Sequence, residues 1–142
     1  MKVIIGADHA GFKLKEKLKK SLEKKNILVE DVGTFSEDSV DYPDYAFKVA
    51  RKISKDKTLK GVLICGTGTG MVMAANRVKG VRASLIYDKY SAVMAREHND
   101  ANIICLRGRK ASSRKQIKLT WLWLNTKFSG EVRHKRRIVK LK

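Results

Sequence analysis

The sequence predicts a single doubly wound, Rossmann-like α/β domain, in which helices cover both faces of one five-stranded parallel sheet. Short apolar runs alternate five times with segments of helical periodicity. The runs are continuously apolar, as in parallel strands that are buried on both faces. The chain has 142 residues, 43% of them apolar, which suits one sizeable core. No linker, low-complexity segment or internal repeat divides it.

The apolar runs predict strands at 2–6, 27–33, 61–65, 81–87 and 102–106. The first helix is predicted by the mostly helical spacing of Phe12, Leu14, Leu18 and Leu22. Pro43 suits the first turn of the second helix, with Asp41 or Tyr42 near its cap. Further helices are expected near 70–78 and 89–98, and a last one with four apolar residues on one face, Ile117, Trp121, Leu124 and Phe128. The basic C-terminal tail, 129–142, falls outside the alternation.

The net charge of +18 invites a polyanion as partner. Seven lysines in 13–25 follow an amphipathic pattern, which we interpret as a solvated helix face. Residues 107–142 carry thirteen Lys or Arg and one acid, Glu131. A small phosphorylated ligand explains such arginines as well as RNA does. We therefore do not expect nucleic acid to be the main ligand, and keep an RNA- or polyanion-binding protein as the alternative of another class.

No apolar run approaches the roughly 20 residues that span a bilayer, so no membrane association is expected. The N-terminus does not resemble a signal peptide. The two cysteines, Cys65 and Cys105, lie in separate apolar runs. This usage is typical of a reduced, cytoplasmic protein without a disulfide framework.

The stretch GVLICGTGTG, residues 61–70, ends a predicted strand in a glycine turn. It is not a dinucleotide fingerprint, because Met71 occupies the place of the third glycine, although Asp88 lies near the distance expected of the acid. The phosphate-binding loop of nucleotide triphosphatases is also absent. Glycines at a helix start can instead aim amide N–H groups at an oxyanion such as an enediolate. Cys65 is then either a reactive thiolate or a small core residue, and Cys105 is predicted to be core.

In doubly wound sheets, ligands bind beyond the carboxyl ends of the strands. That edge is predicted to hold residues from four loops, Asp8, His9, Tyr42, Cys65, Arg107 and Arg109. His98 lies in the polar cluster REHNDAN, 96–102, and no His or Cys spacing predicts a metal site. A thiol, an oxyanion nest, histidines and arginines suit an aldose–ketose isomerisation of a phosphorylated sugar.

Six motifs occur in the order found in one known family: GADHAGF, SVDYPDYA, GVLICGTGTGM, AANRVKGVRA, REHNDANIICL and RHKRR. On them the chain resembles the type B ribose-5-phosphate isomerases over nearly its whole length. That family also holds allose-6-phosphate isomerases and galactose-6-phosphate isomerase subunits, which remain alternatives. The resemblance implies one sugar-phosphate isomerase domain over 1–142, interconverting ribose 5-phosphate and ribulose 5-phosphate in the pentose phosphate pathway.

The resemblance also implies roles for individual residues. Cys65 matches the base that moves a proton between C1 and C2, and His98 matches the acid/base that opens the furanose ring. Thr67 belongs with these catalytic residues, inside the loop that holds the enediolate, Gly66, Thr67, Gly68, Thr69 and Gly70. Substrate contacts are implied for Asp8, His9 and Asn99, and a phosphate clamp for Arg109, Arg133 and Arg137.

The resemblance further implies a homodimer with shared active sites, and leaves open whether two such dimers pair into a tetramer. The His98 and Arg109 side of the site is expected to come from the partner. No metal or organic cofactor is implied. Two departures stand out: Thr69 occupies a place that is often apolar in the family, and SGEVRH has one residue more than usual before the tail. Arg136 therefore stays an alternative to Arg137.

Overall fold

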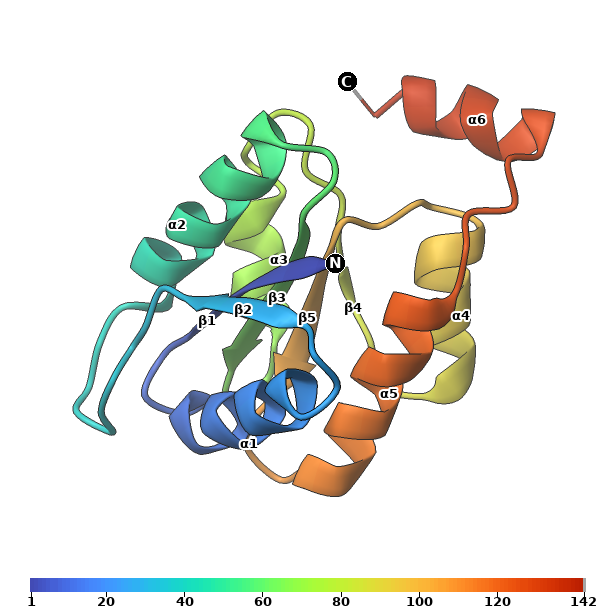
Figure 1. Ribbon diagram of the computed structural model, residues 1–142. Coiled ribbons are helices and arrows are strands. Elements are labelled where there is room, and N and C mark those ends of the chain that lie inside the picture. The colour runs from blue at the N-terminus through green and yellow to red at the C-terminus, as the bar shows by residue number, and fades with distance from the viewer. Residues whose placement is uncertain (142) are drawn as a thin grey trace.

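The computed structural model describes residues 1–141, which form five strands and six helices (Figure 1). Lys142, the last residue of the basic tail, lies outside this range. The strands are β1 (Lys2–Ala7), β2 (Leu28–Asp31), β3 (Lys60–Cys65), β4 (Ala83–Leu85) and β5 (Ile103–Arg107). The helices are α1 (Phe12–Glu23), α2 (Tyr42–Lys55), α3 (Thr69–Ala75), α4 (Lys89–Glu97), α5 (Ser113–Asn125) and α6 (Val132–Val139).

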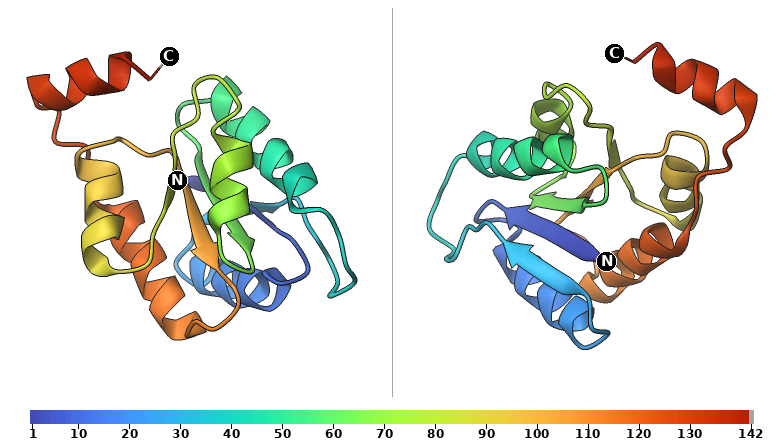
Figure 2. Two further views of the ribbon diagram at one scale, coloured as in Figure 1. Left: turned by 180° about the vertical axis from the view of Figure 1, so that it is seen from behind. Right: turned by 45° about the horizontal axis from the view of Figure 1, so that its top comes forward.

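The strands form one parallel sheet in the order β2-β1-β3-β5-β4, which confirms the predicted fold class. Successive side chains of a strand point to opposite faces, so each buried strand feeds two cores. Val3 and Ile5 pack with α1, α4 and α5, whereas Ile4 packs with α2 and α3. Figure 2 shows these two helical layers from further sides. The three middle strands, β1, β3 and β5, are therefore almost fully buried.

Several predicted elements end earlier than expected. Strand β2 ends at Asp31 and helix α3 at Ala75, where the sequence predicted 33 and 78. Strand β4 covers only Ala83–Leu85 of the predicted 81–87, and the Arg82 amide just before it donates to the Asn102 side chain. The prediction that Phe128 continues the last helix is wrong. Helix α5 stops at Asn125, since the next residue, Thr126, has an extended backbone conformation.

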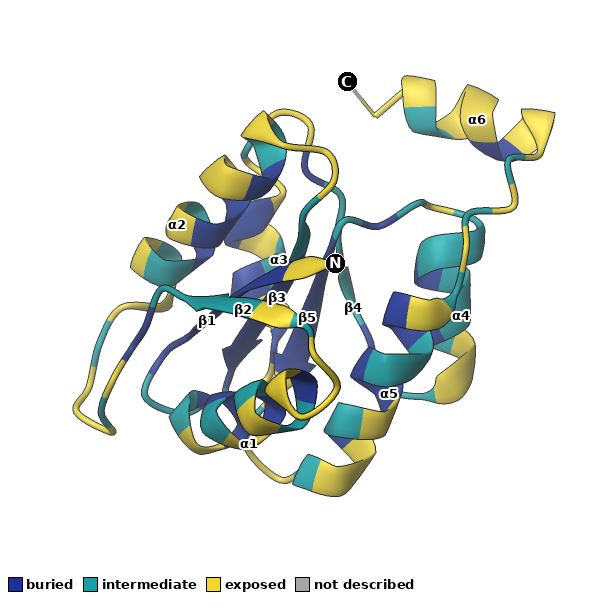
Figure 3. Cartoon of the chain, in the orientation of Figure 1, coloured by how far each residue is buried: buried dark blue, intermediate teal, exposed yellow. Residues whose placement is uncertain are grey.

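The tail contains a helix of its own, α6, which stands away from the sheet (Figures 1 and 2). Most of α6 is exposed, apart from one buried residue, His134 (Figure 3). Hydrophobic residues at its end, Ile138 and Leu141, face a cavity at the amino ends of the strands, beside Lys60 and Asn102. Helix α6 therefore belongs to the amino edge of the sheet.

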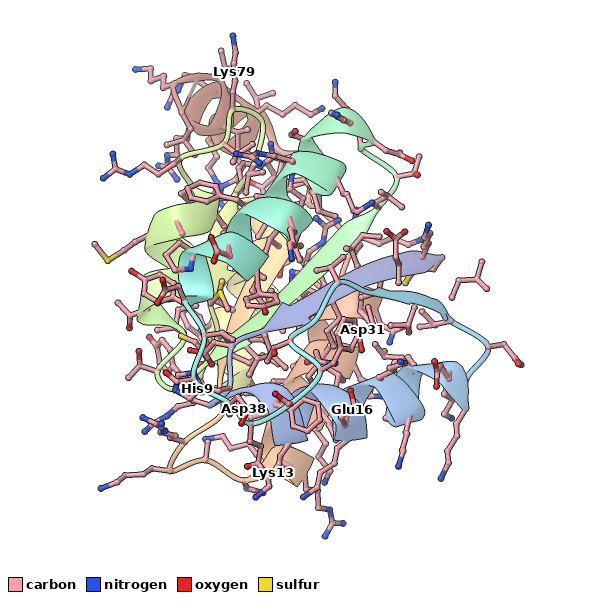
Figure 4. All side chains as sticks on the ribbon, turned by 90° about the vertical axis from the view of Figure 1, so that its left-hand side faces the viewer. His9, Lys13, Glu16, Asp31, Asp38 and Lys79 are labelled. Carbon is pink, nitrogen blue, oxygen red and sulfur yellow. The ribbon has the colours of Figure 1, made fainter. Side chains whose placement is uncertain are left out.

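The solvated face predicted for α1 has one exception. The side chain of Lys15 is completely buried and pairs with Asp31 of β2 and with Glu16. Its ammonium also lies 5.5 Å from the ring centroid of Phe12 and 5.3 Å from that of Phe35. Asp31 is nearly as buried, and its other oxygen accepts from the Gly33 amide (Asp31 and Glu16 are labelled in Figure 4). This pair joins α1, β2 and the segment that follows β2.

We expect Asp31→Asn to lower the free energy of unfolding by about 3 kcal/mol, because it leaves the buried Lys15 ammonium with Glu16 alone. The asparagine oxygen can still accept from Gly33. Urea denaturation at fixed protein concentration measures the loss. The matched control is Glu37→Gln, whose ion pair with Lys13 is exposed and is worth less than about 1 kcal/mol. Equal losses in the two variants would contradict this account of Lys15.

Candidate active site

The loops after the three middle strands are joined by main-chain hydrogen bonds at the carboxyl edge of the sheet. The Asp8 amide donates to Ile64 O at 3.1 Å, which joins the β1 loop to β3. The amides of Gly108 and Arg109 donate to Cys65 O at 2.8 Å and to Gly66 O at 3.1 Å. We call this bonded set, residues 8–11, 64–66 and 108–109, the loop frame. It positions the side chains that the sequence predicted for this edge.

Two glycines allow the loop frame to close. A Cβ atom on Gly11 would lie 2.4 Å from Ile64 O, and one on Gly108 would lie 2.3 Å from Ala10 O. Carbon and oxygen atoms do not approach this closely without a bond, so any larger residue would push the loops apart. The backbone itself, and not side-chain packing, therefore sets the distance between the three loops.

Cys65 ends β3 at the centre of the loop frame, with its side chain almost fully buried. The Gly68 amide donates to Cys65 Sγ at 3.1 Å, and the turn reaches this geometry with a φ of +83° at Gly68, which suits glycine. An N–H aimed at the sulfur stabilises negative charge there. The Thr69 amide is also occupied, since it donates to Thr67 Oγ1 at 3.3 Å. The turn therefore has fewer amides for an enediolate than its five residues suggest.

Asp8 and His9 follow β1 and are both held by main-chain amides. Asp8 Oδ1 accepts from the amides of Ala10 and Gly11, so one carboxylate oxygen shapes the loop. His9 Nδ1 accepts from the Val40 amide at 3.2 Å. A nitrogen that accepts carries no proton, so the proton of neutral His9 lies on Nε2. His9 therefore offers an N–H donor to a ligand (it is labelled in Figure 4).

Arg109 lies on the Cys65 side of the molecule. Its Cδ is 3.5 Å from the position that a Cβ on Gly66 would take. Within one chain, Arg109 therefore lies near Cys65. The expectation that Arg109 and His98 form the same side of the site is wrong. Tyr42 also belongs here, because its ring would lie 2.8 Å from a Cβ on Gly70. The strand-end rule predicts Tyr42 at this edge, whereas the family resemblance implies no role for it.

The remaining predicted residues lie elsewhere. His98 is the C-cap of α4, and Asn99 follows it. The His98 ring stacks on the His134 ring of α6, with centroids 4.2 Å apart and planes 15° from parallel. The tail is also tied to α4 by the Ser129 amide, which donates to Glu97 O at 3.1 Å.

Arg133 and Arg137 are four residues apart on α6, and both are exposed. Because the segment is helical, this spacing puts both arginines on one face of α6. Arg133 Nε pairs with Glu131 at 2.8 Å. Arg136, three residues after Arg133, lies on the same helix and is exposed as well.

The two groups of residues stand at opposite edges of the sheet. In the sheet, Cys65 of β3 lies opposite Arg107, at the carboxyl end of β5. His98 and Asn99 come before Ile103, at the amino end of β5. Four residue rises along β5 separate these ends by about 13 Å. One chain therefore does not bring Cys65 and His98 to the same small sugar.

The nucleotide alternative finds no support in the geometry. Asp88 is the N-cap of α4 and forms a capping box with Ser91, so its carboxylate is used locally. Met71 is fully buried. Cys105 is buried too, which raises the pKa of its thiol well above the usual value and keeps it protonated. Residues 1–141 contain no group of three or more His, Cys, Asp or Glu placed to hold a metal, and no helix among them could cross a membrane.

Comparison with known proteins identifies the family of this chain. A family model described as Ribose/Galactose Isomerase matches residues 3–141, and the chain belongs to that family. It is 36% identical to ribose-5-phosphate isomerase B of Escherichia coli K12 over 137 residues, 96% of this chain and 91% of that protein. Its structure resembles a ribose 5-phosphate isomerase of Thermotoga maritima, with a TM-score of 0.95, 49% identity and coverage of 99% and 96% of the two chains.

A second solved structure includes a bound sugar phosphate. Ribose-5-phosphate isomerase B of Mycoplasma genitalium, described with bound ribulose-5-phosphate, has a TM-score of 0.94 and 42% identity to this chain. The likeness covers 99% of this chain and 93% of that one.

Proposed function

We propose that this chain interconverts ribose 5-phosphate and ribulose 5-phosphate through an enediolate, without a metal or organic cofactor. Family membership and the two solved isomerase structures support the reaction. The observation that carries the mechanism is the Gly68 amide on Cys65 Sγ, at the start of α3 and inside the loop frame. It places the base inside the turn, whose remaining amides hold the oxyanion.

The proton transfers follow from this arrangement. Cys65, as thiolate, removes the C2 proton of the open-chain aldose. The C–H electrons form a C1=C2 double bond, and the carbonyl electrons move to O1 as an oxyanion. Amides of the turn stabilise that oxyanion, with Thr67 at the turn's exposed tip. The O2 proton passes to O1, C2 becomes the ketone, and the Cys65 thiol returns its proton to C1.

The other residues bind and open the sugar. Asp8 and His9 contact the hydroxyl groups and the phosphate, with His9 donating from Nε2. Arg109 approaches the phosphate from the Cys65 side. The opposite side is formed by His98, as acid/base for ring opening, with Asn99, Arg133 and Arg137. Arg136 remains the alternative to Arg137, since it is exposed on the same helix.

A second copy of the chain completes the site in this proposal. The separation of Cys65 and His98 across the sheet supports a homodimer, in which the amino edge of one chain meets the carboxyl edge of its partner. A two-fold axis then makes two equal sites. Further pairing into a tetramer adds nothing that this site needs.

Turnover of ribose 5-phosphate by the EDTA-treated protein tests the reaction. We expect ribulose 5-phosphate to form without any added cofactor. Allose 6-phosphate and galactose 6-phosphate, assayed in parallel, test the substrate. If the protein turns over only a hexose phosphate, the proposed proton transfers stand and the proposed substrate changes. Inactivity on all three sugars would refute the proposal.

A further inference from the structure

His134 is the one buried residue of α6, with only 3% of its surface exposed. Its ring lies flat against the ring of His98, 4.2 Å away. Its Nε2 is buried and has no hydrogen-bond partner among residues 1–141. A buried polar nitrogen without a partner reduces stability, so its presence calls for an explanation.

The His98 ring is contacted on one face by the stacked His134 ring. His98 sits where α4 ends and its side chain is half-buried, so the helix alone leaves the ring free to rotate. A flat aromatic surface against one face of the ring removes much of that freedom. A group that must deliver a proton to a ring oxygen needs such positioning.

From this contact we infer that His134 is a positioning residue, which holds the His98 imidazole by stacking so that it can open the furanose ring. His134 itself touches no reacting atom. The inference rests on the proposed function, because it takes ring opening as the role of His98. It concerns a residue for which the family resemblance implied no role.

The stack works with His134 neutral, since two imidazolium rings at this distance would repel each other. Burial, together with the His98 ring and the Arg133 guanidinium, lowers the pKa of His134 from its usual value. Arg137 acts in the same direction, and Glu131 acts against them. Two acids flank His98 along the chain, Glu97 and Asp100, and Asp100 is already paired with Arg82 and Arg96. A lowered pKa favours the neutral ring, so the stack is intact at pH 7 and weakens as the pH falls.

Two rates separate ring opening from enolisation. Net conversion of ribose 5-phosphate requires ring opening. Exchange of the C1 protons of ribulose 5-phosphate with deuterated solvent does not, because phosphorylation of O5 prevents this ketose from closing a furanose ring. A defect in the position of His98 therefore slows the first rate and spares the second.

We expect His134→Ala to slow net conversion about tenfold or more, and to leave C1 exchange within about twofold. His134→Phe restores the flat surface, and Nε2 makes no hydrogen bond that a carbon would lose. We therefore expect net conversion by His134→Phe to lie within about threefold of the wild-type rate. The rate of net conversion divided by the rate of C1 exchange should also fall as the pH is lowered. This fall should be smaller in His134→Phe than in the wild type, because phenylalanine does not take up a proton. Lys135→Ala, exposed on the same helix, is the matched control and should change neither rate.

Wild-type net conversion by His134→Ala would overturn the inference, and so would an equal loss of both rates. Failure of the proposed function has a different signature, which is that the wild-type protein shows neither rate. In that case the NMR spectrum decides: the ring protons of His98 should be shifted by the His134 ring current, should move in His134→Ala and should stay in His134→Phe. An unmoved His98 signal in His134→Ala would contradict the stack itself.

Discussion

Replacing Cys65 with alanine is expected to reduce turnover of ribose 5-phosphate by about 10²- to 10⁴-fold, the usual range for loss of a general base. Exchange of the C1 protons of ribulose 5-phosphate should fall equally, because both processes need a base at the same carbons. This joint loss distinguishes Cys65 from His98, whose replacement should spare the exchange. Proton NMR in deuterated buffer measures both rates in one sample.

The second cysteine provides the control for this prediction. Cys105 lies on the neighbouring strand β5, fully buried, and its thiol stays protonated. Cys105→Ala should keep the wild-type kcat while lowering the free energy of unfolding by about 1 kcal/mol. A Cys65→Ala protein that turns over as fast as Cys105→Ala would disprove the proposed mechanism and leave the fold unaffected.

Mixing two inactive variants is expected to restore activity. In a dimer of Cys65→Ala with His98→Ala, one site receives Cys65 from one chain and His98 from the other, and is intact. Its second site lacks both residues. Random pairing makes half of all dimers mixed, so about one quarter of wild-type turnover should return. The variants are unfolded and refolded together, and turnover per chain is compared with that of each variant refolded alone.

The position of Arg109 supplies a matched control for the mixing experiment. Arg109 lies beside Gly66, on the same side of its chain as Cys65. A mixed dimer of Cys65→Ala with Arg109→Ala therefore contains no intact site, and its activity should not rise. Equal recovery in both mixtures, or none in either, would argue against a site shared in this way.

The order of strands and helices could be predicted because it depends on local patterns. Continuous apolar runs became β1, β3 and β5, and the family indicated by six motifs is confirmed. Phe128 misled the prediction, since its spacing fits a helix that has already ended at Asn125. Lys15 misled it as well, because Lys15 lies on α1 and its buried ion-pair partner, Asp31, lies on strand β2.

The arrangement of the site was harder to predict, because distance along the chain differs from distance in space. Arg109 follows His98 by only eleven residues. Between them β5 crosses the whole sheet and carries Arg109 to the opposite edge. The stack of His98 on His134 joins segments 36 residues apart, and no periodicity relates them. Such contacts form between segments that are distant in the sequence, so local sequence patterns do not predict them.

The loop frame has a consequence for how the choice of sugar can change. Main-chain groups and two glycines hold the three loops together, so the frame is largely independent of the side chains that it presents. Thr69, exposed where α3 begins, and Tyr42, whose ring covers Gly70, can be exchanged without disturbing it. The depth of the pocket can thus change without a change in the groups that transfer the proton. Selection for a longer sugar could act on these two side chains while Cys65 and the main chain of its turn stay unchanged.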